Sequence, residues 1–177
     1  IMKNKIIDMG AGLERLSWIT MGTPTSYDCS FGPVIKKLIN IAGLPENHQV
    51  IGKYFEIMSG MIGEDDVVPN GSSKVNSVYE MKSLIAHKLG MPEDNLAKII
   101  SPYEAIYTIA DHTRTLLFAI SDGSLPSNVG GVYNLRIILR RALSTLEKMG
   151  WNNVKLDDIT DSHIDYLRQI YPELEDH

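Results

Sequence analysis

Apolar residues recur at helical spacing over most of the chain from residue 13 onward, which predicts a mainly α protein built as a helical bundle. Glycines at 43 and 150 directly follow two of the apolar patterns and are typical of helix C-termini. Polar segments at 22–28, 63–73 and 121–128 predict connections. The pattern predicts helices over Leu13–Met21, Pro33–Ala42, Asn47–Met61, Val75–Leu89, 101 to about 120, and Val132–Met149.

Two helix starts are predicted from capping residues. Ser101-Pro102-Tyr103-Glu104 has a serine, a proline and a glutamate in the positions of a capping box, so a helix is expected to begin there. Asp161 is expected to cap a last helix that carries Ile164, Leu167 and Ile170 on one side.

The N-terminal segment has a different pattern. Lys3 to Ile7 predicts a short strand, and the glycine-rich residues 8–12 predict a turn into the first helix. Since no later segment predicts a partner strand, we interpret this strand, turn and helix as the remnant of a larger sheet. The chain is therefore expected to be part of a longer protein.

Composition narrows the class of protein. The single cysteine, Cys29, excludes an internal disulfide and a cysteine-rich zinc site, and favours an intracellular, cytoplasmic protein. No apolar run approaches the roughly 20 residues of a membrane helix, so no membrane partner is expected. The five histidines show no metal-ligand spacing, and no metal site is predicted. His112 is interpreted as a core histidine that binds a backbone carbonyl, in preference to a general base.

The charge distribution points to a phosphate-binding helix. The net charge is −5, and residues 151–177 account for all of it. Residues 129–150 instead carry four cations against one carboxylate, a net charge of +3. Arg136 and Arg140 are four residues apart and share a helical face, where they could neutralise successive phosphates. The opposite, buried face is expected to comprise Leu135, Ile138, Leu139, Ala142 and Leu146.

Asn128, just before this helix, offers donors and an acceptor to a base edge. The alternative is a solvated charged face with an ordinary turn asparagine, and composition alone does not decide between the two.

A second candidate for ligand binding is Asp8-Met-Gly-Ala-Gly-Leu-Glu-Arg15. Gly10 and Gly12 allow close approach of the backbone to a ligand, and the helix that follows presents its N–H groups to an anion. Arg15, one turn into the helix, could clamp a phosphate. The alternative is a plain strand-to-helix turn with a surface arginine.

This string resembles motif 3 of the class II aminoacyl-tRNA synthetases, in the version found in alanyl-tRNA synthetases. The resemblance implies that Asp8 binds the ammonium group of alanine and that Gly10 lines the aminoacyl pocket. It also implies that Gly12 and Arg15 contact ATP.

Three later blocks resemble the tRNA-recognition region of the same family: Ala110-Asp-His-Thr-Arg114, Pro126-Ser-Asn128, and Tyr133 to Ala142. By this resemblance Asn128 reads a G·U wobble pair in the acceptor stem, together with an aspartate expected beyond residue 177. Further tRNA contacts are implied for Arg114, Arg136, Arg140 and Arg141. Many family members have Gly-Arg-Gly-Tyr and an Arg-Arg pair where this chain has Gly130-Gly-Val-Tyr133 and Arg136-Ile137, so two potential phosphate contacts are absent.

The resemblance divides the chain into residues 1–28, the edge of a catalytic domain, and residues 29–177, part of a helical tRNA-recognition region of the archaeal type. The intact enzyme would use ATP, Mg²⁺ and alanine to charge its tRNA, with no DNA partner. Motifs 1 and 2 and the zinc site of the editing domain are missing, so no catalytic residue is assigned. The isolated chain is predicted to be inactive in aminoacylation. The alternatives are a non-catalytic helical module that binds tRNA or protein, and a structural bundle with no nucleic-acid role.

Overall fold

The computed structural model describes residues 10–46, 49–65 and 78–175, without the side chains of 62–65 and 78. This part of the chain is mainly helical and contains no strand, as the apolar spacing predicts. The predicted strand at Lys3–Ile7 lies outside it. The elements are α1 (Leu13–Met21), α2 (Ser26–Ser30), α3 (Pro33–Ile41), α4 (Gln49–Asp65), α5 (Val78–Leu89), α6 (Glu93–Ser121), α7 (Tyr133–Met149), α8 (Leu156–Leu167) and the 3₁₀ turn η1 (Pro172–Glu175).

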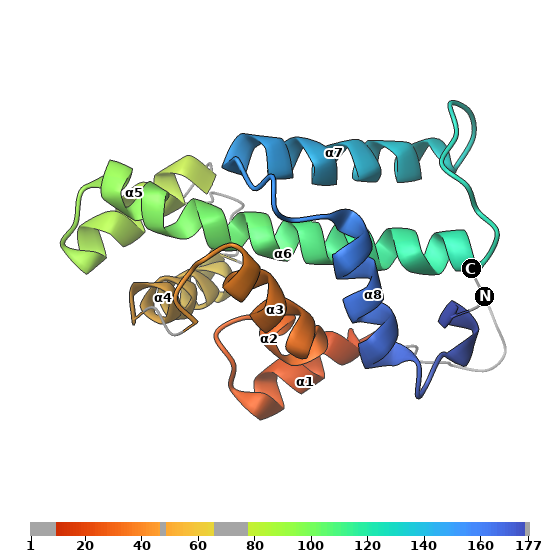
Figure 1. The fold of residues 1–177 in the computed structure, drawn as a ribbon. Helices are drawn as coiled ribbons and strands as arrows, with labels where there is room; N and C mark the ends of the chain where they lie inside the picture. The colour runs from red at the N-terminus through yellow and green to blue at the C-terminus, as the bar shows by residue number, and fades with distance from the viewer. Residues whose placement is uncertain (1–9, 47–48, 66–77, 176–177) are drawn as a thin grey trace, which may run out of the picture.

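Helix α6 is the support on which α3, α4, α5, α7, α8 and η1 pack. It has 29 residues and a length of about 43 Å. Figure 1 shows α7 running back along one side of it and α3 and α8 crossing the other, with α4 and α5 near its N-terminal end. The buried side chains of α6 that belong to the main core are Leu96, Ile100, Tyr103, Ile106, Tyr107, Ile109 and Ala110.

The predicted helix start at Ser101 is wrong, because α6 begins eight residues earlier and contains Pro102. Leu96 and Ile100, which precede the proline, are both buried in the core, and their burial stabilises the helix across the site. Glu104, the expected capping residue, instead forms an ion pair with Lys82 of α5 at 2.8 Å. A capping box describes local preference only, and here tertiary packing overrides it.

The start predicted for the last helix is also wrong. Helix α8 begins at Leu156, so Asp161 lies in its middle and does not cap it. Ile164 and Leu167 belong to this helix, but Ile170 lies beyond its end and is exposed. The helix packs on α3, where the Lys37 ammonium donates to the Ser162 hydroxyl at 2.6 Å and to the Asp158 carbonyl at 3.2 Å.

The predicted connection at 22–28 contains the start of a helix. The Thr25 hydroxyl accepts a hydrogen bond from the Asp28 amide, and the Asp28 carboxylate accepts one from the Thr25 amide, so these two residues form the capping box of α2. The Tyr107 hydroxyl of α6 also donates to Asp28, at 3.4 Å. Burial, together with this carboxylate, raises the pKa of Tyr107. The N-terminal helices are therefore joined to α6 through Asp28.

No helix within the described ranges combines the length and the apolar character that crossing a bilayer requires.

His163 of α8 is a fully buried polar residue against α6. Its Nε2 donates to the Ala110 carbonyl at 3.1 Å and lies 3.2 Å from the Thr113 hydroxyl. Its Nδ1 is buried and has no hydrogen-bond partner among the described groups. Burial and the nearby Arg114 guanidinium lower the pKa of His163 to about 4, so the ring is neutral in the folded protein at neutral pH.

Acidification is predicted to destabilise the fold through His163. The pKa is about 4 in the folded state, against the ordinary value of 6.5 in the unfolded chain. The unfolded state therefore binds more protons between these values, and stability present above pH 6.5 is lost as the pH falls. The expected contribution is about 2 kcal/mol between pH 7 and pH 5. Urea unfolding at the two pH values measures the loss.

The control variant is His163→Gln, which keeps an N–H donor for the Ala110 carbonyl but does not titrate in this range. Its free energy of unfolding should depend much less on pH over this interval. An unchanged dependence in His163→Gln would show that another group causes it.

Candidate nucleic-acid interface

Asn128 lies in a short, constrained loop between α6 and α7. Gly123, with φ of +83°, ends α6, and its amide donates to the Ile120 carbonyl at 2.8 Å. The Ser127 amide then bonds to the Val132 carbonyl at 3.4 Å, which brings the two sides of the loop together. Gly130 has φ of +68°, a conformation that favours glycine. The backbone on both sides of Asn128 is thus fixed by local bonds.

The Asn128 side chain is exposed and forms no hydrogen bond with any other described residue. Its amide therefore keeps both donors and its acceptor for a ligand.

Helix α7 follows this loop directly and exposes the predicted basic face. Arg136 and Arg140 are exposed, whereas Ala142 and Leu146 are buried. Leu135, Ile138 and Leu139 are partly buried, so the apolar stripe predicted from spacing is the less exposed face. The helix packs along α6, and this contact turns the two arginines away from the core.

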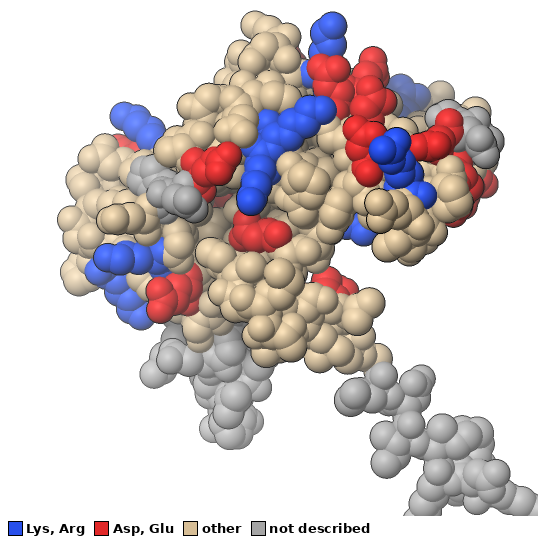
Figure 2. All heavy atoms as spheres, turned by 60° about the horizontal axis from the view of Figure 1, so that its bottom comes forward, with Lys and Arg blue, Asp and Glu red and all other residues tan. Residues whose placement is uncertain are grey.

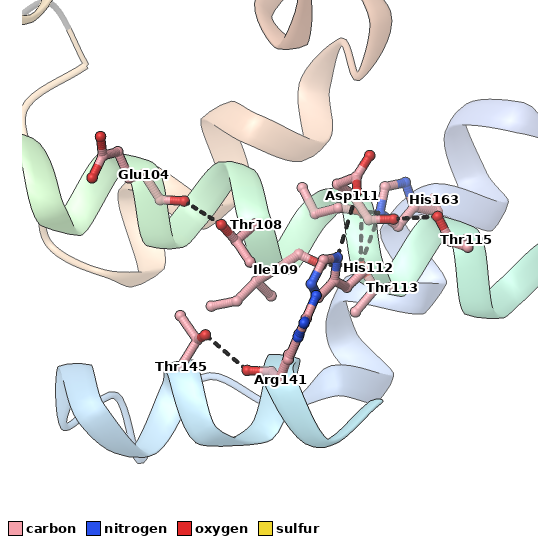
Figure 3. A network of polar contacts seen from close by, with 11 residues as sticks. Glu104, Thr108, Ile109, Asp111, His112, Thr113, Thr115, Arg141, Thr145 and His163 are labelled. Atoms are coloured by element: carbon pink, nitrogen blue, oxygen red, sulfur yellow. Dashed lines mark hydrogen bonds and ion pairs between the residues drawn. The ribbon is translucent and has the colours of Figure 1, made fainter. Parts of the chain in front are cut away.

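Arg141, another residue for which the resemblance implies a tRNA contact, is also exposed. Figure 3 shows Arg141 extending from α7 toward α6, where His112 extends toward α7. His112 is not the carbonyl-binding core histidine predicted from the sequence; its Nδ1 lies 3.4 Å from the Asp111 carboxylate. The histidine that binds a carbonyl in the core is His163, which no local sequence pattern singled out.

Arg114, the remaining candidate for tRNA contact, is engaged within the chain. Its Nη1 donates to the Ser30 carbonyl at 2.9 Å, and its guanidinium lies 4.9 Å from the centre of the Phe31 ring. It therefore links α6 to the end of α2. One of its five N–H donors is therefore used within the chain.

The glycine-rich candidate is only partly within the described residues. Asp8 lies outside them. Gly12 is the N-cap residue of α1, and Arg15, one turn into the helix, is exposed. A side chain at Gly10 would meet no atom of the chain within 4 Å. Nothing within the described chain therefore requires a glycine at position 10.

Helix α1 has no buried residue, and its main partner is the short α2. Its apolar side chains are largely uncovered, with Leu13 and Ile19 each 75% exposed. The ring N–H of Trp18, a residue of α1, donates to the Thr23 carbonyl at 2.6 Å, and this bond fixes the turn after the helix.

The two candidate sites are not brought together. In Figure 1, α1 lies below α6 and α7 lies above it. On the face seen in Figure 2, basic and acidic side chains alternate, so the residues coloured there form no extended basic field. Within the ranges that the structure describes, no group of three or more His, Cys, Asp or Glu side chains could hold a metal ion.

Comparison with known proteins shows which family this sequence belongs to. Residues 1–177 match the family model described as tRNA synthetases class II (A). An alanine–tRNA ligase of Nitrosopumilus maritimus is 45% identical over 177 residues, which cover 99% of this chain and 18% of that protein. The corresponding protein of Cenarchaeum symbiosum is 42% identical over 98% of this chain, and that of Methanosphaera stadtmanae is 40% identical over 97%.

Each of these three alignments spans 18% of the relative's own length. The family model nevertheless covers every residue of the chain. The chain belongs to the class II (A) family of tRNA synthetases.

Proposed function

We propose that this chain works within an alanine–tRNA ligase, where it reads the acceptor stem of the alanine-accepting tRNA and contributes motif 3 contacts to ATP and alanine. The observation that carries the proposal is the Asn128 loop. An exposed asparagine amide without a partner in the described chain stands in a fixed loop, directly before a helix that exposes Arg136 and Arg140. The alanine–tRNA ligase names of the relatives support the choice of tRNA.

The division of labour follows from the chemistry of each group. Phosphate contacts fix the register of a protein on a nucleic acid and carry no sequence information, whereas base-edge contacts specify sequence. Arg136 and Arg140 are suited to the first role. Asn128 is suited to the second, because its amide both donates and accepts at a base edge in the minor groove. Arg141 and Arg114 are proposed to make weaker tRNA contacts than Arg136 and Arg140. Arg114 already donates to the Ser30 carbonyl, and Arg141 extends toward α6 (Figure 3).

Residues 1–28 are proposed to form the edge of the catalytic domain. The uncovered apolar side of α1 supports this, because such a helix side normally packs against another part of a protein. In the whole enzyme, the Arg15 guanidinium would offset charge on the ATP phosphates, and the Asp8 carboxylate would pair with the ammonium group of alanine.

The reaction would join the alanine carboxylate to the α-phosphate of ATP with release of pyrophosphate. A ribose hydroxyl of the tRNA would then attack the carbonyl carbon of the alanyl adenylate, forming the ester and releasing AMP. Mg²⁺ would neutralise phosphate charge when bound. The described residues offer no cluster of His, Cys, Asp and Glu side chains suited to hold it.

Removing the Arg140 side chain should weaken RNA binding without changing base preference. For Arg140→Ala we expect an affinity about fivefold lower at 0.1 M salt, and a slope of log K against log salt that is smaller by about 1, because one phosphate contact is lost. Fluorescence-anisotropy titration of the chain with an RNA hairpin that carries one G·U pair, over a series of salt concentrations, measures both quantities.

Lys88→Ala is the matched control, since Lys88 is an exposed cation on α5, which Figure 1 shows at the other end of α6 from the Asn128 loop. It should leave the affinity and the salt slope unchanged. Equal effects of the two variants would mean that net charge, and not the α7 face, governs binding.

Removing the Asn128 amide should erase the preference for a G·U pair. A base contact of this kind contributes about 1–3 kcal/mol, or roughly 5- to 150-fold in discrimination. Asn128→Ala is therefore expected to bind G·U and G·C hairpins equally, with its binding to the G·C hairpin nearly intact. Asn152→Ala, an exposed asparagine beyond the C-terminal end of α7, should keep the preference. A preference that persists in Asn128→Ala would remove this residue from the reader.

A further inference from the structure

The loop that carries Asn128 is apolar and strongly exposed. Leu125 is 66% exposed, Val129 is 73% exposed, and Tyr133 at the start of α7 is 47% exposed. Residues 123–135 include no charged side chain, although charged residues make up 22% of the chain. We call Leu125, Val129 and Tyr133 the apolar rim. Sequence reasoning missed it because exposed apolar residues in a loop form no helical or strand pattern.

The rim cannot fold back onto the protein without breaking local bonds. The Ser124 amide donates to the Ala119 carbonyl at 2.8 Å, the Ser127 amide to the Val132 carbonyl, and the Val129 amide to the Ser127 hydroxyl at 3.4 Å. The Tyr133 amide donates to the Gly130 carbonyl at 3.2 Å. Along the chain, Asn128 lies between Leu125 and Val129, and the three apolar side chains of the rim are exposed. Exposed apolar area of this kind favours an occupant that removes it from water.

The neighbouring residues indicate which occupant fits. The rim continues directly into the helix that exposes Arg136 and Arg140, so a polyanion bound to those arginines passes beside it. The minor groove of an RNA duplex is wide and shallow, and it displays base edges and the 2′-hydroxyls of the riboses rather than phosphates. The uncharged apolar rim suits contact with the interior of this groove, whereas the arginines suit contact with the phosphates along its edges. A purely apolar protein partner would leave the adjoining cations unused.

We propose that Leu125 and Val129 pack against the ribose faces of the acceptor-stem minor groove on both sides of the pair that Asn128 reads, and that they determine specificity by excluding water from that contact. This inference rests on the function proposed above and deepens it. A hydrogen bond from an exposed amide competes with water, and it discriminates well only when surrounding groups exclude that water. The apolar rim supplies the exclusion, while the amide supplies the donor and acceptor.

The test compares the double variant Leu125→Ser/Val129→Ser with the parent chain on two RNA hairpins that differ only in one G·U or G·C pair. We expect the ratio of the two affinities to fall at least about fivefold, because water then reaches the Asn128 contact. The slope against salt should stay unchanged, because no phosphate contact is lost. Val129→Ile, which keeps the apolar surface, should retain the ratio.

Ile170→Ser is the matched control, since Ile170 is also 73% exposed and lies outside the loop. It should behave like the parent chain in all titrations. Far-ultraviolet circular dichroism verifies that each variant is folded, which is expected since the substituted side chains are largely exposed.

The outcomes separate the two claims. If the parent chain shows no G·U preference, the proposed function fails and the inference fails with it. If the parent chain has the preference and the double variant retains it, the proposed function stands and the role of the apolar rim is overturned. Equal weakening on both hairpins, with an unchanged ratio, also overturns it, because the rim would then contribute affinity alone.

Discussion

The fold depends on α6 remaining one continuous helix through Pro102. A proline inside a helix removes one backbone hydrogen bond and clashes with the preceding turn, at a cost of about 3 kcal/mol. Leu96 and Ile100 lie before the proline, and Ile106 and Ile109 lie after it; all four are buried in the same core. Burial of one such side chain contributes about 1.5–3 kcal/mol, so together they outweigh the cost. Because α6 is unbroken, the contacts at its N-terminal half and the Asn128 loop at its C-terminal end belong to one rigid element.

The continuous helix α6 also keeps apart the two candidate sites, which are the glycine-rich segment before α1 and the Asn128 loop with α7. Helix α1 contacts mainly α2, and α2 is joined to α6 by the Tyr107–Asp28 and Arg114–Ser30 hydrogen bonds. Helix α7 packs on another side of α6. The proposed motif 3 segment and the proposed stem reader are thus attached to one support but face different surroundings. In an intact synthetase such an arrangement would hold the stem at a fixed distance from the chemistry, so that recognition could position the substrate.

The sequence predicted the elements whose signals are local and strong. Helices α3 and α7 end where Gly43 and Gly150 indicated, both with positive φ, and the apolar stripe of α7 is the less exposed one. The starts of α6 and α8 were predicted wrongly, since Ser101 and Asp161 have good capping chemistry that core packing overrides. Arg136, Arg140 and Asn128 are exposed, as a binding role requires. The internal engagement of Arg114 and the burial of His163 depend on residues far apart in the chain, which no local pattern reports.

Amide hydrogen exchange, with and without the G·U hairpin, tests most directly the central claim that α6 is a continuous support for an RNA-reading loop. In the free chain, amides of α6 on both sides of Pro102 should exchange at the same slow rate, because they open only with the whole core. Addition of the hairpin should slow exchange at residues 125–141 and leave α4 and α5 unchanged. Faster exchange of residues 93–101 than of 103–118, or protection by RNA outside the loop and α7, would contradict the account.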